Sequence, residues 1–247
     1  MTINAERIKL QTTRSPIWLI LTVVVVGLGF AAIQAAALGP HGVLQPQRAA
    51  IGVSVFGVPV LMTLSAMAVT GEYRSGMIRT TFLATPRRAW ALTAKAIVMA
   101  AVSAVVTGVM VVVAVLFAAS VLDEPQRAPL SLASIEVWRS VAAMSLYAAL
   151  GAVLAVGLGG LLRHTAAVVA VVLLMPFVVE PVLGALPEVG ARVGPWLPFG
   201  NAYTFTKTPW FQTFSLWWGP LGAAFYFAAV AAGVFALALV VVTRRDP

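Results

Sequence analysis

The chain has 247 residues, of which 61% are hydrophobic and 10% charged, with a formal net charge of +8 and a mean hydropathy of +0.97. Its apolar runs are longer than a soluble core needs, which places it in a lipid bilayer, and their continuity excludes a β-barrel, whose strands alternate apolar and polar residues. The absence of cysteine excludes disulfides, thiolate metal sites and redox motifs, and two distant histidines indicate no metal site. The predicted fold class is therefore an all-α, polytopic membrane bundle.

Six apolar runs predict six transmembrane helices in a single domain over residues 1–247, each near the length of about 20 residues that a span requires. The predicted spans are about 17–38, 49–69, 96–122, 139–162, 166–186 and 220–243. A hydroxyl residue precedes proline at Ser15-Pro16 and Thr85-Pro86, a pairing typical of helix starts, because the first turn needs no proline N–H.

The segment before the first span carries an apolar residue every seven positions, at Ile3, Leu10 and Ile17, with Arg7 and Arg14 beside this stripe. Such a pattern predicts an interfacial helix whose long cationic side chains reach the head groups. The residues of this predicted helix that carry its charge and its stripe are Glu6, Arg7, Lys9, Leu10 and Arg14. The alternative is a basic segment that only fixes the orientation of the first span.

The stretch 70–90, TGEYRSGMIRTTFLATPRRAW, is the most polar long segment, and five of the sixteen cations lie between Arg74 and Lys95. Two antiparallel spans can be joined by far fewer residues, so we expect this stretch to form secondary structure of its own and not only a connecting loop. One side of a short helix is predicted to carry Met77, Ile78, Thr81 and Phe82. Thr85-Pro86 then predicts a second helix with Trp90 at interface depth. This cytoplasmic knob is interpreted either as a docking site for a soluble partner or as a helix that anchors to lipid.

The fourth run contains closely spaced small residues, Gly151, Ala155, Gly157, Gly159 and Gly160. This spacing predicts close helix packing, within one subunit or between two.

Glu180 is the one acid inside an apolar run, about 20 Å up a hydrocarbon slab of about 30 Å. Pro176 and Pro181 bracket it and predict a broken helix. Two interpretations stay open, because a carboxylate at this depth can accept backbone N–H groups freed by the break or can handle cargo or protons.

The segment 186–219 has too many prolines and glycines for a span and too many aromatic residues for a solvated loop. It is predicted to re-enter the outer leaflet and to form an outer gate. The tryptophans expected there are Trp196, Trp210, Trp217 and Trp218.

The distribution of charge predicts the topology, because short cytoplasmic loops retain cations. With both termini inside, the inner segments hold eleven of the sixteen cations and three of the eight acids, so the entire net charge of +8 lies on that side. The simplest interpretation is that this charge sets the orientation of the spans and attracts anionic lipid head groups, and that it does not bind nucleic acid.

Two motifs resemble the membrane subunits of the ABC-2 family of ABC transporters, of the actinobacterial type. The segment GEYRSGMIRTTFLATPRR, residues 71–88, is similar to the family's loop between spans two and three, and ERIKL with TRSPIW, residues 6–10 and 13–18, is similar to its N-terminal opening. The resemblance extends to six spans, inner termini and a long segment between spans five and six. It implies a bacterial plasma-membrane permease subunit, and export of cargo.

In that family the stretch after the second span is a coupling helix that receives force from an ATP-binding subunit. The resemblance gives this role here to Glu72, Tyr73, Arg74, Ser75, Gly76, Met77, Arg79, Thr80, Thr85, Pro86, Arg87 and Arg88. It also implies two separate ATPase subunits that bind ATP and Mg²⁺, and a second permease subunit, expected to be identical. The chain itself is expected to be no enzyme and to bind no cofactor, since none of its three lysines follows a glycine and a P-loop is thereby excluded.

Family architecture places the central cavity between the second and fifth spans of both subunits. The residues expected to line it are Phe56, Met62, Met67, Met175, Phe177 and Glu180. Methionine and aromatic side chains adapt to varied shapes, so hydrophobic or amphipathic cargo such as a drug, antibiotic, lipid or peptide is expected. Ordinary core packing or lipid contact is the alternative for each of them.

A second class of function also fits an intramembrane acid, namely an ion-coupled secondary transporter that uses Glu180 as its proton site. The six runs show no evident inverted repeat, and this class leaves the cytoplasmic knob unexplained. A purely structural membrane scaffold is a third possibility.

Overall fold

The computed structural model describes residues 15–39, 41–78, 88–210 and 214–244, and this part of the chain forms helices and no strands. Within these ranges six helices are long and apolar enough to cross a membrane, as expected of a multi-pass membrane protein. They are α2 (Ser15–Ala36), η1 with α4 (Val53–Gly57 and Val58–Arg74), α6 (Arg88–Val121), α7 (Ile135–Leu162), α8 with η3 and α9 (Thr165–Leu174, Met175–Val179 and Glu180–Ala185), and α12 (Pro220–Arg244).

The boundaries of the second and third spans differ from the sequence prediction. α4 continues to Arg74, five residues beyond the predicted end, and α6 begins at Arg88, eight residues before the predicted start at 96. The prediction ended each span where the apolar run ends, at the first polar residues. In the structure two of these polar residues, Glu72 and Lys95, are buried and bonded to each other. Because that pair satisfies both charges, the two helices continue through the polar stretch.

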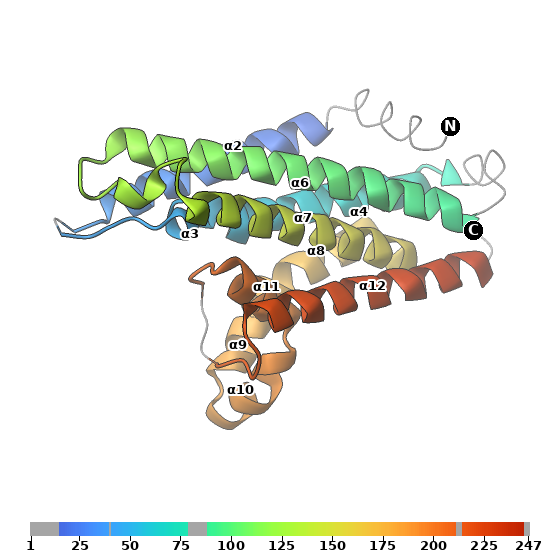
Figure 1. The fold of residues 1–247 in the computed structure, drawn as a ribbon. Coiled ribbons are helices and arrows are strands. Elements are labelled where there is room, and N and C mark those ends of the chain that lie inside the picture. Colours follow the sequence, from blue (N-terminus) through green and yellow to red (C-terminus); the bar gives the residue numbers. More distant parts are fainter. Residues whose placement is uncertain (1–14, 40, 79–87, 211–213, 245–247) are drawn as a thin grey trace.

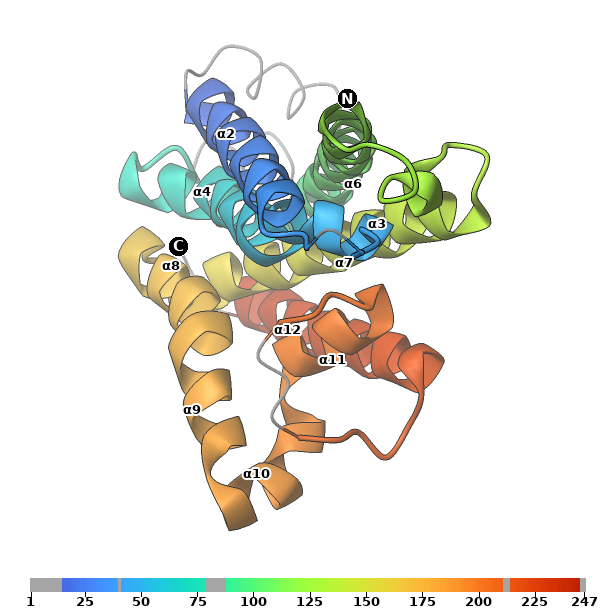
Figure 2. The ribbon, with the colours of Figure 1, turned by 90° about the vertical axis from the view of Figure 1, so that its left-hand side faces the viewer.

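The central helix of the bundle is α7, which packs against α4, α6 and α12 (Figure 2). Its N-terminus is capped by Ser134, whose Oγ accepts the N–H of Glu136 at 3.3 Å, and it ends at Arg163 in the left-handed conformation, with φ 54°. α2 and α6 lie on one side of it, whereas α12 and the short helix α11 lie on the other. The apolar core is accordingly divided into a part shared with α2 and α6 and a part shared with α8, α11 and α12.

Small residues let the neighbours approach α7 closely. A Cβ atom built on Gly157 would lie 3.1 Å from the backbone of Phe235 in α12, and one on Gly159 would lie 3.2 Å from Val69 in α4. One on Gly151 would lie 3.1 Å from the Met62 sulfur. The small-residue spacing therefore serves packing within this chain.

The fifth span leans away from the other helices, so that α9 and the following α10 project from the bundle (Figure 1). The π-helical turn η3 contains Pro176 near its start, and Pro181 follows at the start of α9. Proline has no N–H to donate and disturbs the regular α-helical ladder, which accounts for the π-helical turn. The predicted break is wrong, because the fifth span continues through this turn from Thr165 to Ala185.

Three short helices follow the fifth span: α10 (Pro187–Val193), η4 (Gly194–Trp196) and α11 (Pro198–Thr206). α11 returns to pack on α12 and α7, and most of its residues are buried. Re-entry of this segment into the outer leaflet stays a prediction.

The two ends of the bundle are named here by the predicted topology. The inner end holds Ser15, Arg74 and Arg244, whereas the outer end holds two short helices, α3 (Pro46–Ala49) and η2 (Ala128–Leu130). At the outer end the N–H of Leu44 donates to the carbonyl of Gln126 at 3.1 Å, which joins the loop after α2 to the loop after α6.

Candidate functional site

At the inner end, a buried ion pair joins the second span to the third. Lys95 Nζ in α6 lies 2.7 Å from Glu72 Oε1 in α4, and the two residues are 3% and 4% exposed. A buried pair of this kind contributes little net stability, but it is costly to break, because removal of one partner leaves the other charge buried without this bond. Glu72 therefore anchors the end of α4 to α6.

The same end of α4 is attached to the link between α7 and α8. The Arg163 guanidinium lies 5.1 Å from the ring centroid of Tyr73, within cation–π distance, and Thr165 Oγ1 donates to Thr70 Oγ1 at 2.8 Å. Just beyond α4, the buried side chain of Ile78 faces a small hollow whose other lining residues are Val69, Tyr73, Ala91, Leu92, Lys95 and Val242. We call the four polar contact residues Glu72, Tyr73, Lys95 and Arg163 the inner clamp.

The residues predicted to couple to an ATPase fall into three groups. Glu72 is buried in the inner clamp and Tyr73 is half-buried there, whereas Arg74, Ser75, Gly76 and Met77 form an exposed turn in which Gly76 has φ 71°. Arg88, at the start of α6, is half-buried. The remaining ones, Arg79, Thr80, Thr85, Pro86 and Arg87, lie outside the described residues, as do Glu6, Arg7, Lys9, Leu10 and Arg14 of the predicted interfacial helix.

Aromatic residues of the second and fifth spans meet near the start of the second span, toward the outer end of the bundle. The Phe56 ring in η1 stacks on Phe177 in η3, with centroids 5.2 Å apart, and Phe30 and Trp210 contact Phe56 at 4.7 and 5.5 Å. Both phenylalanines lie in π-helical turns, which occur often at functional sites. Two of the residues predicted to line a path are therefore together, and Trp210 lies with them, away from the other predicted gate residues.

The other predicted path residues have different surroundings. Met62 is fully buried between α4 and α7, where it packs against Gly151. Met67 and Met175 are half-buried, and Met175 packs against the core part shared by α7, α8 and α12. Met62 therefore contributes to the core of this chain.

Glu180 connects the fifth span to the short helix α11. Its Oε1 accepts the N–H of Phe199 at 2.8 Å and its Oε2 accepts the N–H of Gly200 at 2.7 Å, while the residue is 4% exposed. These donors belong to the first turn of α11, whose N–H groups have no partner within the helix. The carboxylate thus satisfies N–H groups of another helix, not those freed by the prolines in its own.

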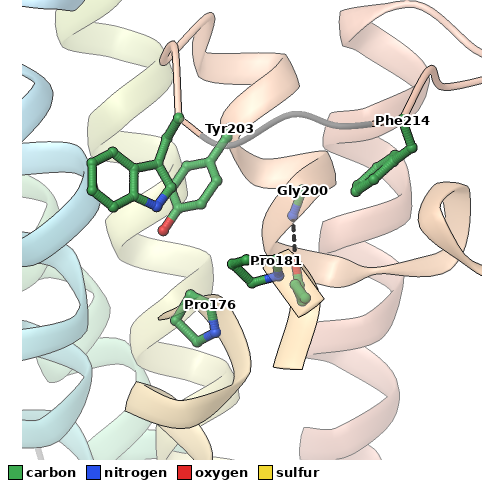
Figure 3. Close-up of a pocket in the computed structure, with 7 residues that line it drawn as sticks. Pro176, Pro181, Gly200, Tyr203 and Phe214 are labelled. Atoms are coloured by element: carbon green, nitrogen blue, oxygen red, sulfur yellow. Dashed lines mark hydrogen bonds between the residues drawn. The ribbon is translucent and has the colours of Figure 1, made fainter. Parts of the chain in front are cut away.

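A small hollow lies beside this carboxylate. Figure 3 shows Tyr203 and Phe214 on opposite sides of the hydrogen bond that the Gly200 N–H donates to Glu180, with Pro176 and Pro181 below them. The full lining is Pro176, Glu180, Pro181, Gly200, Tyr203, Trp210 and Phe214. The hollow is therefore aromatic on its walls and carries one acid.

Three of the four predicted gate tryptophans form one cluster. Trp196, Trp217 and Trp218 meet nearly at right angles, with ring centroids 5.8 to 6.1 Å apart, and Tyr226 of α12 stacks on Trp218. Trp218 Nε1 donates to Asn201 Oδ1 at 2.8 Å, and the Tyr226 hydroxyl donates to the Trp196 carbonyl at 2.6 Å. The first bond attaches the segment after α11 to α11, and the second attaches η4, which precedes α11, to α12.

A chain of three buried hydroxyls joins η1 to the end of α11, and the sequence analysis did not identify it. Thr208 Oγ1 lies 2.9 Å from Ser54 Oγ and 2.8 Å from Thr206 Oγ1, and Thr206 Oγ1 donates to the Ala202 carbonyl at 2.9 Å. Each hydroxyl has one hydrogen, so Thr208 donates to Thr206 and Ser54 donates to Thr208. Isolated Ser and Thr residues in apolar runs give no sequence signal of such pairing.

The inner clamp was missed for a similar reason. The Lys95–Glu72 pair has a weak signal in the sequence, namely one acid and one lysine at facing ends of adjacent spans, but charge counts placed both residues at the cytoplasmic surface. Within the described residues, no three His, Asp or Glu side chains lie close enough to hold a metal ion.

Comparison with known proteins gives no family assignment. No protein-family model matches this chain, and no curated protein matches it in a sequence search.

Proposed function

We propose that the protein is the membrane permease subunit of an ATP-driven exporter of the ABC-2 type, in a bacterial plasma membrane. Two copies would form the translocation path for a hydrophobic or amphipathic molecule, and two separate ATPase subunits would bind ATP and Mg²⁺. The observation that carries the proposal is the exposed turn at Arg74–Met77, which directly follows a helix end attached to three other spans.

A coupling element has to move the spans when its partner moves. The inner clamp supports this role, because it attaches the end of α4 to α6 through Glu72–Lys95 and to the α7–α8 link through Tyr73–Arg163. Breaking a buried ion pair costs about 3–5 kcal/mol, so displacement of this end is expected to shift the attached helices together with it.

The aromatic contacts near the start of the second span support the transport part of the proposal. Phe56 and Phe177 bring the second and fifth spans into contact through π-helical turns, which occur often at functional sites. Their aromatic rings, with Trp210, offer an apolar surface suited to amphipathic cargo.

The alternative, an ion-coupled carrier with Glu180 as proton site, is less well supported. Both oxygens of Glu180 accept backbone N–H bonds that hold α11 in place, which favours the structural interpretation of this residue. A proton-driven carrier would transport cargo in vesicles without nucleotide, and Glu180→Gln would abolish that transport.

The first observation needed is a reading frame for a P-loop ATPase beside this gene, whose absence would weaken the proposal. The decisive experiment then tests the coupling role with that ATPase. Arg74→Ala and Met77→Ala change exposed residues of the turn, whereas Arg192→Ala removes an exposed cation from α10 at the other side of the protein and is the control. We expect the double variant to lose most co-purification with the ATPase and most cargo-stimulated ATP hydrolysis, and the control to keep both. Full retention of both by the double variant would contradict the proposal.

A further inference from the structure

A polar hollow opens at the outer end of the bundle, opposite the end that holds the inner clamp. It has a volume of about 520 Å³ and is lined by Gln45, Gln47, Arg48, Glu136, Lys207 and Pro209. These residues come from three separate parts of the chain: the α3 region, the first turn of α7, and the segment that follows α11. We call it the outer-rim hollow.

The charge of the outer-rim hollow is positive. Arg48 and Lys207 are both exposed, and neither makes an ion pair with an acid of the described residues. The single acid, Glu136, is already engaged, because its Oε2 accepts from Gln47 Nε2 at 3.3 Å and lies 3.8 Å from Arg139 Nη1. Arg48 and Lys207 therefore line the hollow without an ion-pair partner among the described residues. Its one carboxylate, Glu136, is bonded to Gln47 and paired with Arg139.

The backbone of the lining is held in place by the fold. Gln47 is only 7% exposed, and its bond to Glu136 joins α3 to α7. Lys207 has φ 54°, a left-handed conformation that Gly or Asn adopts more readily, and its N–H donates to the Thr204 carbonyl at the end of α11. The neighbouring Thr208 is fixed by the Ser54–Thr208–Thr206 hydroxyl chain. The two cations thus stand on anchored backbone from two separate parts of the chain.

The depth of the hollow indicates the kind of ligand. Glu136 is the second residue of α7, and α3 ends four residues before η1 begins, so the lining lies where two spans leave the apolar layer. At that level a bilayer presents phosphate groups of its lipids. Arginine and amide donors match phosphate oxygens, and lysine adds a point charge.

We propose that the outer-rim hollow binds a phosphate group, held by Arg48 and Lys207 with the amide of Gln45 as a further donor. The expected source is the head group of an anionic phospholipid or phosphorylated amphiphile, and free phosphate is the other source of the same chemistry. Binding here needs no ATPase, so its failure would leave the proposed function untouched.

The test uses the purified full chain in detergent micelles and counts bound molecules by native mass spectrometry. The probes are short-chain phosphatidylglycerol and, separately, inorganic phosphate as its competitor. The variant Arg48→Gln with Lys207→Asn removes both charges, and Asn suits the left-handed conformation at position 207. Arg192→Gln removes an exposed cation outside the hollow and is the matched control. The thermal midpoint of each variant reports whether it is folded.

We expect the double variant to bind phosphatidylglycerol at least about tenfold more weakly than the unchanged chain, since two charge-assisted bonds are lost. The control is expected to bind as the unchanged chain does. Displacement of the lipid by millimolar phosphate would identify free phosphate as sufficient, and resistance to it would identify the lipid as the source. Equal binding by the double variant and the unchanged chain, or equal loss in the control, would overturn the proposal. If the double variant is unfolded, phosphatidylglycerol binding is compared between Lys207→Asn and Lys207→Arg. Weaker binding by Lys207→Asn alone would support the proposal, and equal binding by the two variants would overturn it.

Discussion

Two buried carboxylates, Glu72 and Glu180, are stabilised by different kinds of partner. Glu72 has a lysine at 2.7 Å, whereas Glu180 accepts two backbone N–H bonds from the start of α11. The first arrangement compensates a charge with a charge, and the second compensates it with unsatisfied donors at a helix N-terminus. Substitutions at the two sites are therefore expected to have different signatures.

Removal of one partner of the inner ion pair is expected to destabilise the protein strongly. Lys95→Met removes the ammonium group that lies 2.7 Å from the buried Glu72 carboxylate, and we expect the free energy of unfolding to fall by about 3–5 kcal/mol. The double variant Glu72→Gln with Lys95→Met removes both charges and is expected to recover most of that loss. Denaturant unfolding in detergent, followed by tryptophan fluorescence, measures both. Equal destabilisation of the single and double variants would contradict the assigned pairing.

Loss of one acceptor at Glu180 is expected to loosen α11. In Glu180→Gln the amide nitrogen faces the N–H of either Phe199 or Gly200, so one donor is left unsatisfied at a cost of about 1–3 kcal/mol. Limited proteolysis should then cleave the segment 187–219 faster, while the rate of cleavage between α6 and α7 stays unchanged. Cleavage rates identical to those of the unchanged chain would argue against the structural role of this residue.

At the scale of elements, the packing of α7 depends on the absence of side chains at its glycines. Gly157 approaches the backbone of Phe235 in α12, whereas Gly233 in α12 has no atom within 4 Å of the position where a Cβ would lie. The same chemical change is therefore expected to have opposite results at these two positions of neighbouring helices.

Gly157→Val is expected to separate α7 from α12 and to lower the free energy of unfolding by about 1–3 kcal/mol, because a backbone contact cannot yield as a side chain does. Gly233→Ala is the matched control and is expected to be neutral or stabilising by about 1 kcal/mol, since alanine favours a helix over glycine. Thermal unfolding followed by circular dichroism compares the two. A Gly157→Val variant as stable as the unchanged chain would refute the close approach of the two helices.

At the scale of the whole molecule, the absence of cysteine gives a direct test of topology. Ser75 is exposed at the inner end and Ser131 is exposed at the outer end, so each can be replaced by a single reporter cysteine. With inner termini, a membrane-impermeant maleimide added to intact cells should label Ser131→Cys and leave Ser75→Cys unlabelled until the cells are opened. The reverse pattern would invert the predicted orientation and place the inner clamp outside.

The sequence predicted which segments form much of the candidate site, but it did not predict which side chains contact one another. Hydrophobic length predicted the existence of all six spans, whereas the break predicted from the prolines around Glu180 is a π-helical turn within a continuous fifth span. Trp210 was grouped with the other tryptophans because it shares their segment, although in the fold it packs on Phe56. Segment membership is a property of sequence, whereas the partner of a ring depends on how the segment folds back.

The sequence by itself determined that this protein belongs in a membrane, how many spans it has and how its cations are distributed along the chain. These properties depend on residue composition summed over lengths of about 20 residues. Only the tertiary structure decided that Glu72 is buried against Lys95, that Glu180 binds the start of α11, and that Arg48 and Lys207 face one hollow. Each of these contacts joins residues between 19 and 159 positions apart, so no local pattern encodes it. The free energy of such a pair depends on burial and distance, which exist only after the helices have packed.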